Sequence, residues 1–192
     1  MSVIDVTPDV TIKIEIGGGS VDTEKLSTAT NLLNGEAEGS LRSVNAAPET
    51  DEYKLGKNSN ALGKSTQAPG EAAFATGLST SARNRGSFAG GMGTLSQGVA
   101  AHSEGNSTQA LSDYQHVQGK HNIPDSSNRY PHIVGNGTSY NDRSNAHTLD
   151  WDGNAWFAGD VYIGGTSQDS GKKLATVEDV LAALPTWNGG AY

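Results

Sequence analysis

Three histidines recur at a nearly regular spacing along the middle of the chain. His102 and His116 are fourteen residues apart, and His132 follows sixteen residues later. If three copies of the chain pack around a threefold axis, each position places three imidazoles in a ring that binds a transition metal. Phe74 and Phe88 hold the same position in two earlier segments, so the alternative is a column of stacked, half-buried rings. We favour this packing interpretation, and we predict neither a metal nor any other cofactor.

The other residues that commonly carry chemistry indicate no reaction. They are two histidines and four aspartates: His121, His147, Asp142, Asp150, Asp152 and Asp160. The histidines have no partner at ligand spacing, so we expect them on the surface. Paired carboxylates suit glycoside cleavage, but three of these aspartates flank turn signals, which favours roles in turns and at strand ends. The glycine-rich segments lack a lysine at phosphate-loop spacing. The sequence therefore predicts a protein that is not an enzyme.

Aromatic side chains gather near the C-terminal end of the sequence. Four lie in one segment and two in the tail: Trp151, Trp156, Phe157, Tyr162, Trp187 and Tyr192. Tryptophan and tyrosine stack on sugar faces and dominate protein interfaces. For the four residues in the first segment, we favour packing within one chain or between chains. The same residues are also the best candidates for binding a ligand.

A glycine returns every fourteen residues in the middle of the chain, at Gly63, Gly77, Gly91, Gly105 and Gly119. Two residues before each glycine stands alanine, serine or valine, and three residues after it stands threonine or asparagine. A sixth copy, centred on Gly135, follows after an excess of two residues. A fixed period in a chain rich in small residues indicates a solenoid. We expect glycine to turn the corners, and the small column to point into a narrow interior.

Composition supports stacked repeats more than an ordinary globular core. Leu, Ile, Val and Phe make up 34 of the 192 residues, and glycine makes up 25. The net charge is −8, and residues 1–55 carry ten acidic and four basic side chains. Without a basic patch we expect no binding to nucleic acid. No run reaches 18 apolar residues and no signal peptide is visible, so we expect no membrane span.

The repeat resembles a known family. The segments "NALGKSTQA", "EAAFATGLSTSA" and "AAHSEGNSTQA" are similar to the fourteen-residue repeat in the head of YadA-type trimeric autotransporter adhesins, over about residues 56–139. That resemblance implies a left-handed parallel β-roll, with three rolls packed about a threefold axis. The "QHVQG" core and the tryptophan-rich hairpin that follows the repeats look more like phage and prophage tail fibres or related virion appendages.

These patterns predict a mainly β homotrimer in four parts. Residues 1–55 form an attachment segment, with a strand over 3–16, a short helix over 22–34 and an acidic linker. Residues 56–140 form the β-roll, and 141–170 an aromatic β-hairpin that turns at Asp152–Gly153. Residues 171–192 hold a short trimerising helix over 171–184 and a tail. The positions of the helix that follow a heptad spacing are Leu174, Val177, Leu181 and Leu184.

We therefore expect a non-enzymatic fibre on the surface of a phage or phage-like particle, extracellular after release. Its N-terminal segment would dock to a capsid or tail protein, and its C-terminal part would present weak sites to a host-surface glycan, binding by avidity. The alternative is a purely structural decoration or spacer protein that binds only other virion proteins. A polysaccharide-cleaving spike is the least favoured hypothesis.

Overall fold

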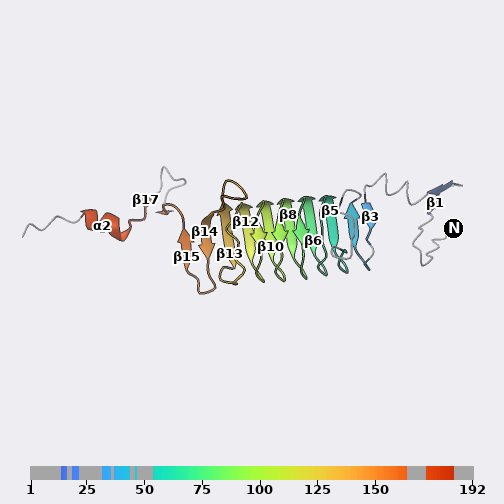
Figure 1. Cartoon of the computed structure of the whole chain (residues 1–192), viewed down its shortest axis with the longest axis horizontal. Helices are drawn as coiled ribbons and strands as arrows, with labels where there is room; N and C mark the ends of the chain where they lie inside the picture. The colour runs from blue at the N-terminus through green and yellow to red at the C-terminus, as the bar shows by residue number, and fades with distance from the viewer. Residues whose placement is uncertain are drawn as a thin grey trace, which may run out of the picture. The chain divides into compact units, whose positions relative to one another are not determined.

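The computed structural model describes residues 14–16, 19–21, 32–35, 37–43, 46, 54–163 and 172–183. The chain divides into two compact units, residues 1–155 and residues 156–192. The described residues are mainly β, with one short helix, α2 (Val177–Ala183), in the second unit. The predicted fold class is thus confirmed in its coarse form, because the first unit is a β-solenoid of about six turns (Figure 1).

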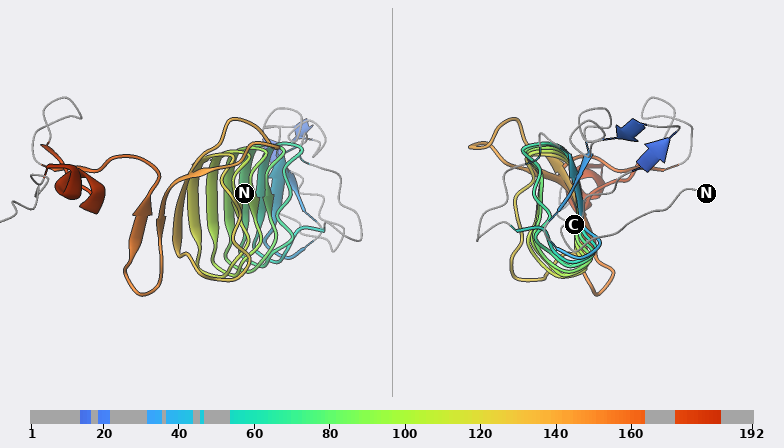
Figure 2. Two further views of the ribbon diagram at one scale, coloured as in Figure 1. Left: turned by 60° about the vertical axis from the view of Figure 1, so that its left-hand side comes forward. Right: turned by 90° about the vertical axis from the view of Figure 1, so that its right-hand side faces the viewer.

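One long sheet carries the solenoid. Its strands, in their order across the sheet, are β3 (Leu32–Asn34), β4 (Leu41–Ser43), β5 (Asn60–Lys64), β6 (Phe74–Leu78), β8 (Phe88–Met92), β10 (His102–Asn106), β12 (His116–Lys120), β13 (His132–Asn136), β14 (Asn145–Leu149) and β15 (Ala155–Phe157). The six strands from β5 to β13 run parallel. Each starts a new turn of the chain, and the turns stack side by side around a narrow interior (Figure 2).

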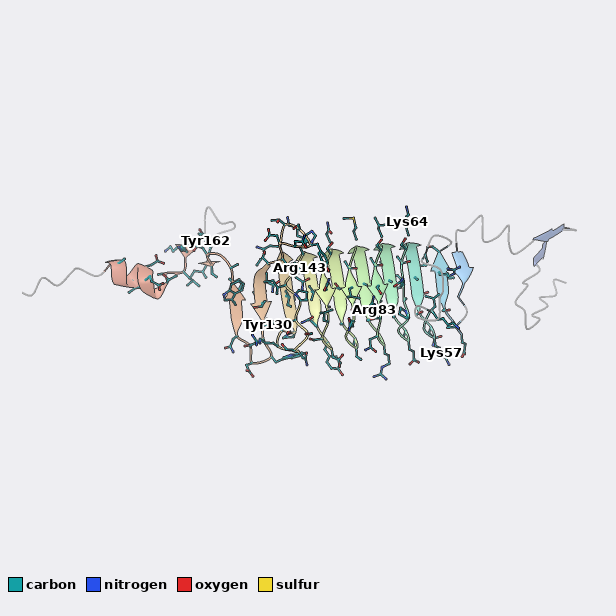
Figure 3. All side chains as sticks on the ribbon, in the orientation of Figure 1. Lys57, Lys64, Arg83, Tyr130, Arg143 and Tyr162 are labelled. Carbon is teal, nitrogen blue, oxygen red and sulfur yellow. The ribbon has the colours of Figure 1, made fainter. Side chains whose placement is uncertain are left out.

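Parallel pairing places equivalent residues of successive turns next to one another. Phe74 pairs with Phe88, and Phe88 with His102. Three of the turns contribute a second strand each to a smaller parallel sheet, made of β7 (Ser81–Ala82), β9 (Leu95–Ser96) and β11 (Gln109–Ala110). The corners of the turns carry outward side chains. Lys57, which precedes β5, and Lys64, which ends it, point away from the solenoid at opposite edges (Figure 3).

The interior of the solenoid is lined by small side chains. One inward position recurs in the six parallel strands and is at most 1% exposed throughout: Ala61, Ala75, Ala89, Ser103, Val117 and Ile133. A second inward column holds Thr66, Thr80, Thr94, Thr108 and Asn122, also at most 1% exposed. Little apolar surface is buried per turn, so the hydrogen-bonded ladder between turns carries much of the cohesion. This explains how the chain folds with so few large apolar residues.

The recurring glycines lie inside strands, which corrects the expectation that they turn the corners. Gly77 belongs to β6 and Gly91 to β8, with φ of +114° and +108°. A Cβ on Gly77 would lie 2.0 Å from the carbonyl oxygen of Gly91. The corner residues two positions later also have positive φ, but they are mostly not glycine: Ser65, Ser79, Gly93, Ser107 and His121. Glycine is required at these strand positions for two reasons: successive turns approach too closely for a Cβ, and the backbone φ is positive.

The two extra residues before the sixth copy are absorbed in a loop that precedes β13. Asp125 organises this loop, because its carboxylate accepts hydrogen bonds from the backbone N–H groups of Ser127, Arg129 and Tyr130 and from the side chain of Gln115. Burial alone would raise the pKa of Asp125, but the hydrogen bonds from the Ser127 hydroxyl and from the three backbone N–H groups outweigh it and hold the pKa below its ordinary value. The loop thus leaves β13 in register with β12.

The helix predicted over residues 22–34 is wrong at its C-terminal end. Residues 32–34 form strand β3, antiparallel to β4, and β4 pairs in parallel with β5. Hydrogen bonding along the end of the solenoid outweighs the weak local helix propensity of this segment. Residues 22–31 lie outside the described residues. Earlier in the chain, β1 (Ile14–Ile16) pairs antiparallel with β2 (Gly19–Val21), in agreement with the end of the strand predicted over 3–16. Residues 3–13 of that predicted strand lie outside the described residues.

In the second unit, the predicted helix over 171–184 is wrong at its start. Strand β17 (Lys172–Lys173) pairs antiparallel with β16 (Tyr162–Ile163), and the ammonium group of Lys173 lies 2.9 Å from the carboxylate of Asp160. Helix α2 begins only at Val177. Leu174, predicted as its first heptad position, precedes the helix and is 47% exposed.

A capping box decides where α2 starts. The Thr176 hydroxyl accepts a hydrogen bond from the backbone N–H of Asp179, and the Asp179 carboxylate accepts one from the backbone N–H of Thr176. The backbone N–H and the hydroxyl of Thr176 both donate hydrogen bonds to the Asp179 carboxylate, and these two bonds lower the pKa of Asp179. Val177 and Leu181 fall within the helix, and Leu184 lies outside the described residues.

Candidate functional site

Six aromatic rings form a continuous ladder along the outer face of the long sheet. The ring ladder consists of Phe74, Phe88, His102, His116, His132 and His147, and consecutive ring centroids are 4.3–5.7 Å apart. Five of the rings come from equivalent positions of parallel strands, so their spacing follows the strand separation. All of them are half-buried. The three histidines named from the sequence therefore share one column with the two phenylalanines.

The structure adds His147 to the ladder, although the sequence indicated no partner for it. Strand β14 runs antiparallel to β13 and places the His147 ring 5.4 Å from that of His132. The fixed period ends at β13, so spacing alone offered no signal for this contact. His121, also expected on the surface, occupies a corner, and its Nδ1 atom is buried without a hydrogen-bond partner.

Glu104 is a site residue that the sequence analysis missed. It lies two residues after His102 on β10, and alternate residues of a strand point to the same face. One carboxylate oxygen is 3.6 Å from Nε2 of His102, and the other is 3.8 Å from Nε2 of His116. Ligand atoms of the three side chains lie within 4.8 Å of one another. The two-residue spacing between His102 and Glu104 was the signal in the sequence that could have identified Glu104.

The histidine end of the ladder disfavours accumulation of positive charge. Burial lowers the pKa of His132, and the neighbouring imidazoles of His116 and His147 lower it further, because two adjacent rings cannot both be protonated without repulsion. His132 itself lies outside the cluster formed by His102, Glu104 and His116. The cluster therefore differs from the threefold-ring arrangement considered from sequence, since its ligand atoms come from two turns of one chain.

Three of the aromatic side chains predicted as binding candidates are solvent-exposed. Trp151, in the first unit, is 54% exposed, and its indole N–H donates a hydrogen bond to the carbonyl of Asn128 at 3.0 Å. In the second unit, Trp156 and Phe157 are 55% and 48% exposed, and Tyr162 is half-buried. Trp187 and Tyr192 lie outside the described residues.

Three of the four aspartates considered for glycoside cleavage have structural partners, and the fourth, Asp152, is exposed in a turn. Asp150 accepts hydrogen bonds from Asn154 and from backbone N–H groups of the turn, which lowers its pKa. This turn connects β14 to β15 at the predicted Asp152–Gly153 position. Asp142 accepts a hydrogen bond from Thr138, and Asp160 pairs with Lys173. These contacts fit turn and strand-end roles.

No protein-family model, no curated protein and no solved structure matches the chain. Within the described ranges, no helix has both the length and the apolar character that crossing a bilayer requires.

Proposed function

We propose that the protein is a non-enzymatic attachment fibre of a phage or phage-like particle, built as a homotrimer of left-handed fourteen-residue β-rolls. Its N-terminal segment docks to a virion protein, and its C-terminal part meets the host surface. The observation that carries the proposal is the solenoid itself. Its turns stack through backbone hydrogen bonds around Ala, Ser and Thr side chains, which makes a stiff rod with little interior volume.

Association of several chains is supported by the outer face of the long sheet. The half-buried rings of Phe74 and Phe88 lie there in adjacent strands. Leu78 and Met92, paired in the same two strands, are 40% and 46% exposed. Apolar side chains that gather on one exposed face mark surfaces that contact other protein. A second and third copy would cover this strip.

Light scattering of the full chain tests the assembly. We expect a mass of three chains, and we expect Met92→Glu to shift the mass toward one chain because a carboxylate would enter the apolar contact. Tyr114→Glu is the matched control, since Tyr114 is 63% exposed at a corner of the roll. A wild-type chain that is monomeric at all concentrations rejects the trimer.

Adhesion is supported by the exposed indoles and phenyl ring near the C-terminal end, which suit stacking on sugar faces. Three weak sites on one rigid trimer bind through avidity. We expect the full chain to be retained on a glycan array or on whole bacterial cells, and Trp156→Ala to reduce retention while Tyr114→Ala leaves it unchanged. Retention on neither surface rejects adhesion and leaves the capsid-decoration role.

A further inference from the structure

We propose that His102, Glu104 and His116 form a binding site for a divalent transition metal, with Zn²⁺ as the preferred ion. The site lies on the outer face of two adjacent turns, β10 and β12, and one chain supplies all three ligands. The proposal is independent of the fibre function and of the number of chains in the assembly.

The separation of the ligand atoms suits a small ion. Tetrahedral Zn²⁺ with bonds of about 2.0–2.1 Å holds neighbouring ligand atoms roughly 3.3 Å apart. The Glu104 carboxylate is 3.6 Å from Nε2 of His102 and 3.8 Å from Nε2 of His116. The two distances are to different carboxylate oxygens, and the ligand atoms of the three side chains lie within 4.8 Å of one another. The side chains must therefore rotate to bring these atoms to the tetrahedral spacing.

The two imidazole nitrogens lack any other partner. Nε2 of His102 and Nε2 of His116 are shielded from solvent, and neither makes a hydrogen bond. Buried polar atoms without partners are costly, since each forfeits its hydrogen bonds to water. A bound cation would satisfy both nitrogens at once. The Phe88 ring, stacked on His102 at 4.3 Å, helps to hold that imidazole in place.

The donor set indicates the class of ion. Two imidazoles and one carboxylate favour Zn²⁺, Co²⁺ or Cu²⁺ over Ca²⁺ or Mg²⁺, which prefer oxygen ligands. Three protein ligands leave a fourth position for water or for a group from another molecule. Gly90 pairs with Glu104 from the preceding turn, and the Phe88 ring covers it, because a Cβ built on Gly90 would lie 2.7 Å from that ring.

Metal titration of the full chain, prepared without an affinity histidine tag and stripped with a chelator, tests the site. Zn²⁺ is added in a calorimeter, and Co²⁺ is followed through the visible absorption of its four-coordinate complex. We expect one metal ion per chain. One ion per three chains would instead place the metal on a threefold axis and overturn the proposal, as would the absence of saturable binding.

Three variants locate the ligands. His102→Phe restores the residue type of the preceding turns, so the ladder should still form, and we expect it to weaken Zn²⁺ binding by at least about 100-fold, more than loss of an outer-shell contact. Glu104→Gln, which keeps the shape of the side chain, should weaken it about 10–100-fold. His132→Phe is the matched control in the same column: it keeps a ring beside His116 and removes no proposed ligand, so it should weaken binding clearly less than His102→Phe does.

Circular dichroism confirms that each variant is folded before titration. If His102→Phe does not fold, Glu104→Gln alone decides the outcome. Unchanged affinity in a folded Glu104→Gln or His102→Phe overturns the site. An equal loss in His132→Phe also overturns it, because binding would then depend on the ladder as a whole and not on the three ligands.

Discussion

Gly77 lies in the middle of the parallel sheet, and its replacement by alanine tests why glycine recurs there. The residue pairs with Gly91 of the next turn and has φ of +114°. An added Cβ would lie 2.0 Å from the Gly91 carbonyl oxygen, whereas real Cβ contacts essentially never fall below 3.0 Å. The two turns must therefore separate locally, beyond normal hydrogen-bond distance.

The expected cost has two sources. A left-handed backbone costs a residue with a side chain about 1–2 kcal/mol. Separation of the turns breaks roughly two ladder hydrogen bonds, each worth about 1 kcal/mol. We therefore expect Gly77→Ala to lower the free energy of unfolding by about 3–4 kcal/mol, a large part of the stability of an ordinary domain. Urea denaturation followed by far-ultraviolet circular dichroism measures this change.

Gly86→Ala is the matched control. Gly86 also has positive φ, +64°, but the nearest atom to an added Cβ is Cα of Ala100 at 4.0 Å. Ala72 and Ala100 already occupy the equivalent corners with φ of 53° and 51°. We expect a loss of only about 1 kcal/mol from the backbone conformation. If Gly77→Ala costs no more than Gly86→Ala, close approach of the turns is not the reason for glycine.

Three further predictions concern the interior and the loop before β13. Thr80→Val should raise the free energy of unfolding by about 1 kcal/mol, because the buried Thr80 hydroxyl has no hydrogen-bond partner. Thr108→Val should lower it by about 1 kcal/mol, because the Thr108 hydroxyl forms a hydrogen bond with Ser103. Ile133→Ala should cost about 2–5 kcal/mol in urea denaturation, because Ile133 is fully buried. Asp125→Asn should cost about 1–3 kcal/mol at neutral pH and remove part of the acid sensitivity of the fold.

The pH dependence at Asp125 has a definite sign. Its pKa in the folded chain lies below the ordinary value of 3.8, so the unfolded chain binds the proton first as the pH falls. The stabilisation is fully present above that value and is lost as the pH falls through the folded pKa. Denaturant midpoints of the wild type and Asp125→Asn between neutral and acidic pH measure it, and parallel curves would contradict the assignment.

Contrary results for the interior variants would also be informative. A Thr80→Val variant as unstable as Thr108→Val would mean that the Thr80 hydroxyl has a partner, such as an internal water. A loss well under 1 kcal/mol in Ile133→Ala would mean that the turns collapse into the space that the side chain leaves.

The period of the sequence determined the solenoid and the positions that line it. When equivalent residues return at a fixed spacing, stacked turns place them in one column, so the small inward residues and the ring column of Phe74, Phe88 and His102 followed from the pattern. The same logic identified glycine as necessary. It did not reveal that Gly77 and Gly91 lie within strands, where the next turn leaves no room for a Cβ. Spacing carries no information on φ or on the distance between turns.

Tertiary structure decided what lies beyond the period. His147 reaches the ladder only because β14 reverses direction, and residues 32–34 become a strand only because β4 offers an edge. Helix α2 starts at its capping box, so Leu174 stays outside it. The approach of Glu104 to both His102 and His116 combines alternation along one strand with pairing between two turns. The first relation is readable in the sequence, and the second exists only once the turns have stacked.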